Sequence, residues 1–215
     1  MMTIEHHPDE AMLAAYSAGV LDLGQRVALA THVRGCPRCR EWVRAMEGVG
    51  GEIVEACDPV AMSDDALDRT LARLGEPAPP GRARPVETED SPPELPDFVR
   101  RYAFGDWRFV APRVKMQPIH LPEPGPTRVF LLKSAPNTRL LQHEHTALEM
   151  TCVLRGAFRH DGGRYGPGDF DLGDEMVTHE PRIEEGEDCL CLVAMQGDLR
   201  WKGVWGLLAR PFVRL

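Results

Sequence analysis

Two stretches of this 215-residue chain gather side chains that commonly bind metal ions. HVRGCPRC at residues 32–39 supplies one imidazole and two thiols, and HEHTALE at residues 143–149 supplies two imidazoles and a carboxylate. These are the groups with which proteins hold zinc and related transition metals. Each stretch is therefore a candidate metal site, provided that its local structure turns these groups toward one point.

The first candidate site combines two imidazoles with two thiols: His7, His32, Cys36 and Cys39. Four such groups make the closed tetrahedral set of a structural zinc site. Cys36 stands where a helix would be capped, and Pro37 fits the first helical position, where a missing N–H costs nothing. The positive end of that helix favours thiolates. On chemistry alone His6 competes with His7, and a redox-active cysteine pair is the alternative to zinc.

The second candidate site depends on strand geometry. His143, His145 and Glu149 all have odd numbers, so in a strand their side chains point the same way, into an apolar run. A bound cation would satisfy these polar groups. Without a metal, the same side chains would lie on an outer, solvated face of the strand. Cys189 and Cys191 also share one face of a predicted strand, either as small core residues or as oxidation sensors.

Four short helices are predicted before residue 76. Their segments are DEAMLAAYSAG, LGQRVALATHVRG, CPRCREWVRAMEGVGGEIVEA and SDDALDRTLARLG. The first, second and fourth end at Gly19, Gly35 and Gly75, and the fourth begins with a Ser and two Asp that suit a cap and a first turn. Such a small bundle has a thin core, which a metal staple would stabilise.

The rest of the chain divides into a linker and a β domain. Residues 77–96 contain seven prolines and almost no large apolar groups, so we expect a semi-extended linker that isolates the helices from the β domain. Beyond the linker, short runs rich in β-branched and aromatic residues alternate with turn residues, which predicts a double-sheet β-barrel. The predicted fold is α+β in two domains, with a helical domain at 1–76, the linker at 77–96 and a barrel at 97–215.

Composition excludes some functions. The chain has 25 basic and 33 acidic residues and a net charge of −8, which argues against a nucleic-acid-binding surface. It has no apolar run of about 20 residues that would span a membrane and no apolar leader at its start. We therefore expect a cytoplasmic protein, in which the six cysteines are thiols or metal ligands rather than disulfides.

The first candidate site, with the helices around it, resembles the zinc-containing anti-sigma domain. That family shares the His…H-x3-C-x2-C spacing on a small helical bundle, and the resemblance covers about residues 1–75. It implies that the ligands are His7, His32, Cys36 and Cys39, and that the domain binds an extracytoplasmic-function sigma factor. Residues 1–76 carry a net charge of −6, which suits a basic, DNA-binding partner, although a solvated helix surface explains the charge equally well.

The second candidate site resembles a sequence motif of the cupin family. This motif, the first of the family, is H-x-H-(x)3–4-E-(x)6-G and ends here at Gly156. Asn137 replaces the leading glycine of that motif, and Asn is the next-best residue for a left-handed turn. The cupin fold implies a fourth ligand from a later strand, for which His179 in VTHEP is the candidate. This segment lacks the usual P-x-G before the His. Three imidazoles and one carboxylate suit Zn, Mn, Fe or Ni.

The two parts together resemble the ChrR-type anti-sigma factors, with THVRGCPRC, the H-x-H-x3-E strand and DCLCL all in the positions of that family. In the family the cupin domain takes part in sensing oxidative stress, notably singlet oxygen. The resemblance implies a non-enzymatic regulator. The alternatives are a metal-dependent cupin dioxygenase or isomerase with a helical docking domain, and a sensor of metal homeostasis. His120 and His160 match no motif and are expected at the surface, and His6 is expected to be solvated.

Overall fold

A computed structural model describes residues 3–77, 92–123, 125–140, 143–145, 147–173, 178–197 and 199–201; at 143–145, 178–179 and 199–201 it describes the backbone. Most of the predicted linker lies outside the described residues. The helices are α1 (Glu10–Ser17), α2 (Leu23–Gly35), α3 (Pro37–Glu55), α4 (Ala66–Leu74) and α5 (Asp97–Arg100). The strands are β1 (Ala103–Phe104), β2 (Arg108–Ala111), β3 (Val114–His120), β4 (Thr127–Ser134), β5 (His143–His145), β6 (Glu149–Arg155), β7 (Phe158–His160), β8 (Gly163–Tyr165), β9 (Phe170–Gly173), β10 (Thr178–His179), β11 (Arg182–Ile183), β12 (Cys189–Gln196) and β13 (Leu199–Trp201).

The four helices predicted before residue 76 are all present, and local signals account for most of their ends. Asp22 caps α2 in a capping box with Gln25. Gly19 has φ +70° just after α1, the left-handed conformation that commonly ends a helix. The predicted start of the fourth helix was early: Asp65 occupies the cap position of α4 but makes no side-chain cap bond.

The strands form antiparallel sheets. The largest has the order β1-β3-β4-β12-β6-β9, with β2 paired to β3, and two three-stranded sheets have the orders β10-β5-β13 and β11-β7-β8. Asn137 adopts φ 59°, as expected of a residue that replaces a glycine in a left-handed turn.

The two faces of the large sheet belong to two different apolar clusters. Along β12, Leu190, Leu192 and Ala194 pack with the helices, whereas Cys189, Cys191, Val193 and Met195 pack with the aromatic residues of β7 and β8. The same alternation along β6 places Met150 and Cys152 on the helix side and Val153 on the opposite, inner side. Both faces of the central strands are therefore covered, one of them by helices.

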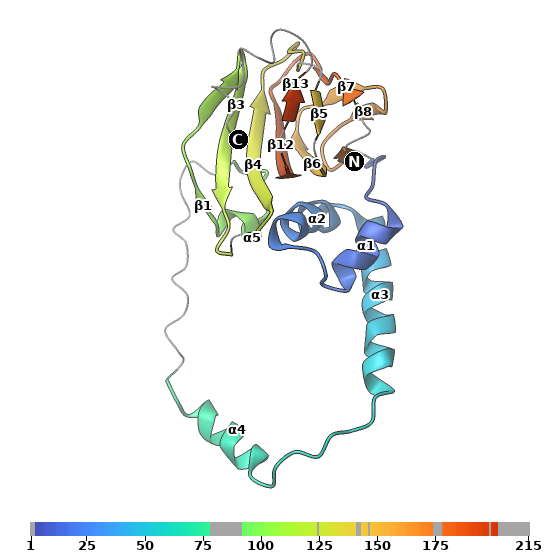
Figure 1. Cartoon of the computed structure of the whole chain (residues 1–215), viewed down its shortest axis with the longest axis vertical. Coiled ribbons are helices and arrows are strands. Elements are labelled where there is room, and N and C mark those ends of the chain that lie inside the picture. The colour runs from blue at the N-terminus through green and yellow to red at the C-terminus, as the bar shows by residue number, and fades with distance from the viewer. Residues whose placement is uncertain are drawn as a thin grey trace.

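Helix α2 lies against the helix side of this sheet (Figure 1). Its buried residues Val27, Leu29 and Val33 belong to the same apolar cluster as the outward residues of β4, β6 and β12. The cap residue of α2 also bonds to the sheet: Asp22 Oδ2 accepts from Thr127 Oγ1 at 2.6 Å and from Gln196 Nε2 at 3.1 Å. The expectation that the linker isolates the helices from the barrel was therefore wrong, because α2 buries its apolar face on the sheet.

The predicted bundle is also less complete than expected. Helices α1, α2 and α3 contact one another, but α4 stands apart from them and from the sheet (Figure 1). No residue of α4 is buried, and α3 has no buried residue after Val43. Among the described residues, no helix is both long and apolar enough to cross a membrane.

Candidate metal centre

The structure brings together the four residues of the first candidate site: His7, His32, Cys36 and Cys39. One potential ligand atom from each lies within 4.8 Å of all the others, and His32, Cys36 and Cys39 are buried. His7 Nδ1 lies 3.4 Å from the sulfur of each cysteine, and His32 Nε2 lies 3.3 Å from Cys39 Sγ. His7 joins this cluster from the segment before α1, His32 from the end of α2, and the cysteines from the start of α3.

These distances suit a tetrahedral ion. With metal–sulfur bonds of about 2.3 Å and metal–nitrogen bonds of about 2.0–2.1 Å, neighbouring ligand atoms of a tetrahedron lie roughly 3.3–3.8 Å apart. The three nitrogen–sulfur distances of 3.3–3.4 Å fall in this range. Two thiols and two imidazoles are also the donor set that zinc prefers in closed structural sites. The residues present therefore fit a zinc ion.

The start of α3 positions the sulfur of Cys36. Cys36 is the N-cap of α3, Pro37 occupies the first turn, and the Cys36 sulfur accepts a hydrogen bond from the backbone N–H of Cys39 at 3.5 Å. That N–H would otherwise lack a partner at the helix end. The helix terminus thus directs the partial positive charge of its N–H groups at the Cys36 sulfur.

One hydrogen bond fixes which nitrogen of His32 can bind a metal. His32 Nδ1 lies 2.8 Å from the carbonyl oxygen of Gly168, and a carbonyl only accepts, so Nδ1 carries the proton. Nε2, which faces Cys39, is left with a free lone pair. Burial, more than the neighbouring His7, lowers the pKa of His32 to about 4, so the ring is neutral near pH 7. A neutral, oriented imidazole is what a metal needs.

Without a metal, the Cys39 thiol stays protonated near pH 7. Burial and the adjacent Cys36 raise the pKa of the Cys39 thiol to about 12. A metal ion at this point would displace the proton, because thiolate and not thiol is the ligand. Metal binding at this site is therefore coupled to proton release and weakens as the pH falls.

The structure distinguishes His6 from His7, a choice that the sequence left open. His7 faces the two thiols, whereas the ring of His6 stacks on Tyr165 with centroids 4.0 Å apart. His6 is thus packed on the barrel rather than solvated as expected. His160 was also misplaced: its side chain is 7% exposed, and its Nε2 lies 3.1 Å from Asp171 Oδ2. Neither residue carries a local sequence signal, because Tyr165 is remote from His6 in the chain and Asp171 lies on a different strand from His160.

Sequence reasoning missed Asp169, which lies next to the centre. It is 4% exposed, and its Oδ1 accepts from the backbone N–H groups of Glu5 and His6 at 2.7 and 2.9 Å. The Gly-Pro-Gly-Asp run at residues 166–169 marks a turn in the sequence, but nothing local shows that the turn would reach the first metal site.

The second candidate site is described mainly by its backbone. His143 on β5 is the register partner of His179 on β10, although the two residues lie far apart in the sequence. Glu149 begins β6 with the same parity as Val153, on the inner side of the sheet, and its Oε1 accepts from Thr151 Oγ1 at 3.2 Å. The side chains of His143, His145 and His179 lie outside the described residues, so this ligand set stays a prediction.

Cys189 and Cys191 share the inner face, as their spacing predicts. Both are buried, at 2% and 6% exposure, and their sulfurs lie 3.7 Å apart. Their contact and burial raise the pKa of the Cys191 thiol. They occupy core positions, which agrees with the simpler of the two interpretations of this pair.

Comparison with known proteins identifies the family. Residues 96–197 match the family model of the ChrR cupin-like domain. Over 219 aligned residues the chain is 38% identical to the anti-sigma-E factor ChrR of Cereibacter sphaeroides, with 100% of each chain covered. The chain belongs to the ChrR family of anti-sigma factors.

A solved ChrR structure supports the same assignment. The chain matches the anti-sigma ChrR of Rhodobacter sphaeroides, crystallised in complex with SigE, with a TM-score of 0.76 and 32% identity. The match covers 90% of this chain and 100% of the other. The fold is therefore that of the ChrR family, with N-terminal helices followed by a cupin-like sheet domain, as the sequence predicted.

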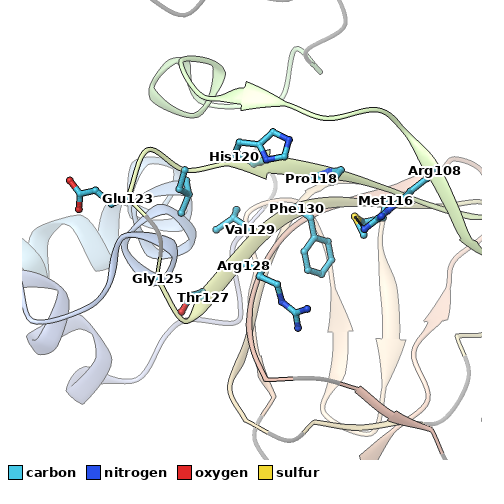
Figure 2. A pocket seen from close by; sticks show the side chains of 12 residues that line it. Arg108, Met116, Pro118, His120, Glu123, Gly125, Thr127, Arg128, Val129 and Phe130 are labelled. Atoms are coloured by element: carbon cyan, nitrogen blue, oxygen red, sulfur yellow. Dashed lines mark hydrogen bonds between the residues drawn. The ribbon is translucent and has the colours of Figure 1, made fainter. Parts of the chain in front are cut away.

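The ChrR-like sheet domain also carries a surface groove of about 280 Å³ along β3 and β4 (Figure 2). Arg108, Arg128 and His120 lie around it, and Met116, Pro118 and Phe130 give it an apolar wall. His120 is exposed, as expected. Among the side chains that the structure describes, no predicted metal ligand lines this groove, so the groove is distinct from the helical metal centre.

Proposed function

We propose that this chain sequesters an extracytoplasmic-function sigma factor in the cytoplasm and releases it on oxidative stress, notably singlet oxygen, sensed through a metal-binding cupin domain. Zinc at His7, His32, Cys36 and Cys39 would stabilise the helices, and a divalent metal at His143, His145, Glu149 and His179 would serve the cupin domain. The chain would act by binding and not by catalysis. The solved complex of the relative ChrR with SigE supports the choice of partner.

The observation that carries this proposal is an unpaired apolar surface on two helices. Leu67, Leu71 and Leu74 recur at positions i, i+4 and i+7 along one face of α4 and are 53–79% exposed. Val49, Ile53 and Val54 are exposed in the second half of α3. Soluble monomers rarely expose such patches unless a partner covers them, and an amphipathic helix in a groove is a common mode of partner binding.

Charge supports a basic partner. Residues 47–76, which include this exposed surface, contain 8 acidic and 2 basic residues. A sigma factor contacts DNA and is expected to carry basic surfaces. Complementary charge would speed capture and favour this partner over acidic proteins.

The backbone register supports the second metal. The backbone positions of His143 and His179 are register partners across β5 and β10, although the two residues are distant in the sequence. Glu149 shares the inner face of β6 with Thr151 and Val153 rather than the face covered by α2. On the neighbouring strand β12, Met195 is the register partner of Glu149, and Cys191 is the register partner of Val153.

The experiment uses a reporter gene transcribed by an extracytoplasmic-function sigma factor that the purified full-length chain binds. The full-length chain should silence the reporter in the dark and release it under light with a photosensitiser. Glu149→Ala should keep the silencing, lose the response to light and reduce metal content from two ions per chain to one. Silencing that is absent in the dark would contradict the sigma assignment, whereas a normal light response in Glu149→Ala would contradict only the role of the cupin metal. Oxygen uptake with turnover of a small molecule would favour the dioxygenase alternative.

A further inference from the structure

The helical metal centre is enclosed from two sides. Helices α2 and α3 and the segment before α1 supply its ligands, and a barrel turn between β8 and β9 closes over it. Residues 166–169 form this turn, the 166–169 turn. It belongs to the sheet domain, about 130 residues from the nearest ligand along the chain.

Four hydrogen bonds join the 166–169 turn and the first residue of β9 to the metal ligands or to the residues just before them. The Gly168 carbonyl accepts from His32 Nδ1 at 2.8 Å and so sets the tautomer of that ligand. Asp169 Oδ1 accepts from the N–H groups of Glu5 and His6, and the Phe170 N–H donates to the His6 carbonyl at 3.1 Å. The backbone immediately before His7 is thereby fixed on the barrel.

The fit between these two segments is tight. A Cβ added to Gly168 would lie 2.7 Å from Ile4 Cδ1 and 2.8 Å from Ile4 Cγ1. The His6 ring stacks on Tyr165, which directly precedes the turn. Asp169 is buried, and its second oxygen accepts from the Gly166 N–H at 2.8 Å. The carboxylate thus connects the turn to the N-terminal segment with no oxygen left unused.

The turn is equally well connected to the interior strand β6. The Gly168 N–H donates to the Val153 carbonyl at 2.8 Å, and the Val153 N–H donates to the Asp169 carbonyl at 3.0 Å. Val153 lies four positions after Glu149 on β6. A displacement of β6 would therefore move the groups that hold His32 and the segment before His7.

We propose that the 166–169 turn is the outer shell of the helical metal centre, so that metal affinity at the helices and docking of the barrel on residues 4–7 depend on each other. The inference rests on the proposed zinc binding by His7, His32, Cys36 and Cys39. It deepens the proposed function by naming a physical contact through which a change in the barrel reaches the helices. Coupling of this kind is reciprocal: a barrel that releases residues 4–7 weakens zinc binding, and loss of zinc loosens the barrel contact.

The test compares two glycine variants of the full-length chain. Gly168→Ala should push Ile4 away from the turn and lower metal affinity at the helical site by about tenfold or more, the range typical of outer-shell changes. Gly186→Ala is the matched control, since Gly186 has a similar φ of +104° against +90°, but nothing lies within 4 Å of its added Cβ. Ile4→Ala combined with Gly168→Ala should recover most of the lost affinity, because the clashing atoms are removed.

Cobalt(II) titration provides the readout without any sigma factor. Thiolate ligands give cobalt a charge-transfer absorption, so this signal reports the Cys36 and Cys39 site and not the predicted His/Glu site, and zinc competition then gives the affinity. Equal affinities for Gly168→Ala and Gly186→Ala would overturn the inference while leaving the proposed function intact. A chain that gives no thiolate absorption at all would overturn the zinc assignment and this inference with it.

Amide exchange on the unaltered chain tests whether metal binding tightens the contact between the barrel and residues 4–7. This measurement does not require any variant to fold. The N–H groups of Glu5, His6 and Phe170 should exchange more slowly in step with the thiolate absorption as cobalt is added. Amides between β4 and β12, which are remote from the turn, serve as the internal control. Exchange at the three amides that does not change with occupancy of the helical site would also overturn the inference.

Discussion

The helical segment consists of two halves that both form helices but are buried to very different extents in the folded chain. Residues 9–46 bury their apolar face on the sheet and around the metal centre, whereas residues 47–76 contain no buried residue. Both halves carry apolar residues at helical spacing, such as Met12 and Tyr16 in α1 and Leu67 and Leu71 in α4. The difference teaches that an apolar stripe shows that a helix needs a partner, but not whether this chain or another supplies it.

The largest effect should come from removing a thiol of residues 9–46, the docked half of the helical segment. Cys39→Ser is expected to abolish metal binding at the helices and to release α1–α3 from their packing, at a cost of several kcal/mol, because binding energy at structural zinc sites is folding energy. Metal content and limited proteolysis measure this. Cys57→Ser is the control, since Cys57 is exposed and lies outside the cluster. A metal-free Cys39→Ser chain with unchanged protease resistance would show that packing on the sheet suffices without metal.

The next largest effect should appear in residues 47–76, the exposed half of the helical segment. It should change only the binding of the sigma factor. Leu71→Glu places a charge on the apolar face of α4 and should weaken sigma binding by about 2 kcal/mol or more, as for a central interface residue. The free energy of unfolding should stay the same, because Leu71 is 53% exposed. Ala72→Glu adds the same charge about 100° around α4 from Leu71, off the face that carries the three leucines, and should bind sigma normally. Equal binding by both variants, measured by calorimetry, would mean that α4 is not the contact surface.

A smaller effect should follow from disturbing the contact between α2 and the sheet. An alanine at Gly24 would place its Cβ 2.7 Å from Thr127 Cβ and 2.8 Å from the Thr127 carbonyl oxygen. Since backbone cannot move aside cheaply, Gly24→Ala should lower the free energy of unfolding by about 1–3 kcal/mol. Urea denaturation of the full-length chain measures this. A neutral result would show that α2 is only loosely seated on β4.

The smallest effect should come from the equivalent change in the exposed half. Gly48 lies in α3 with nothing within 4 Å of an added Cβ, so Gly48→Ala should stabilise the helix by up to about 1 kcal/mol. The same urea measurement compares it with Gly24→Ala. Opposite signs for these two variants would support the division into a docked and an exposed half, whereas destabilisation by both would argue that α3 packs against the chain beyond Met46.

Much of the fold was predictable because its signals are local. Cys36 and Pro37 indicated the start of α3, Gly19 and Gly35 indicated helix ends, and the alternation along β6 and β12 placed side chains on the correct faces. These predictions depend on neighbours within a few residues. The predicted isolation of the helices from the barrel failed, because the partner of α2 is a sheet more than 90 residues away in the chain.

The candidate metal centre likewise has some features that follow from the local sequence and others that depend on the tertiary structure. By itself, the sequence determined the four residue types of the helical centre, the H-x3-C-x2-C spacing and the capped helix that presents the thiols. Only the tertiary structure decided that His7 rather than His6 faces the thiols, and that Nε2 of His32 is the free nitrogen. The physical reason is that both choices depend on the 166–169 turn, whose Gly168 carbonyl lies 136 residues from His32 in the sequence and 2.8 Å from its ring in the folded chain.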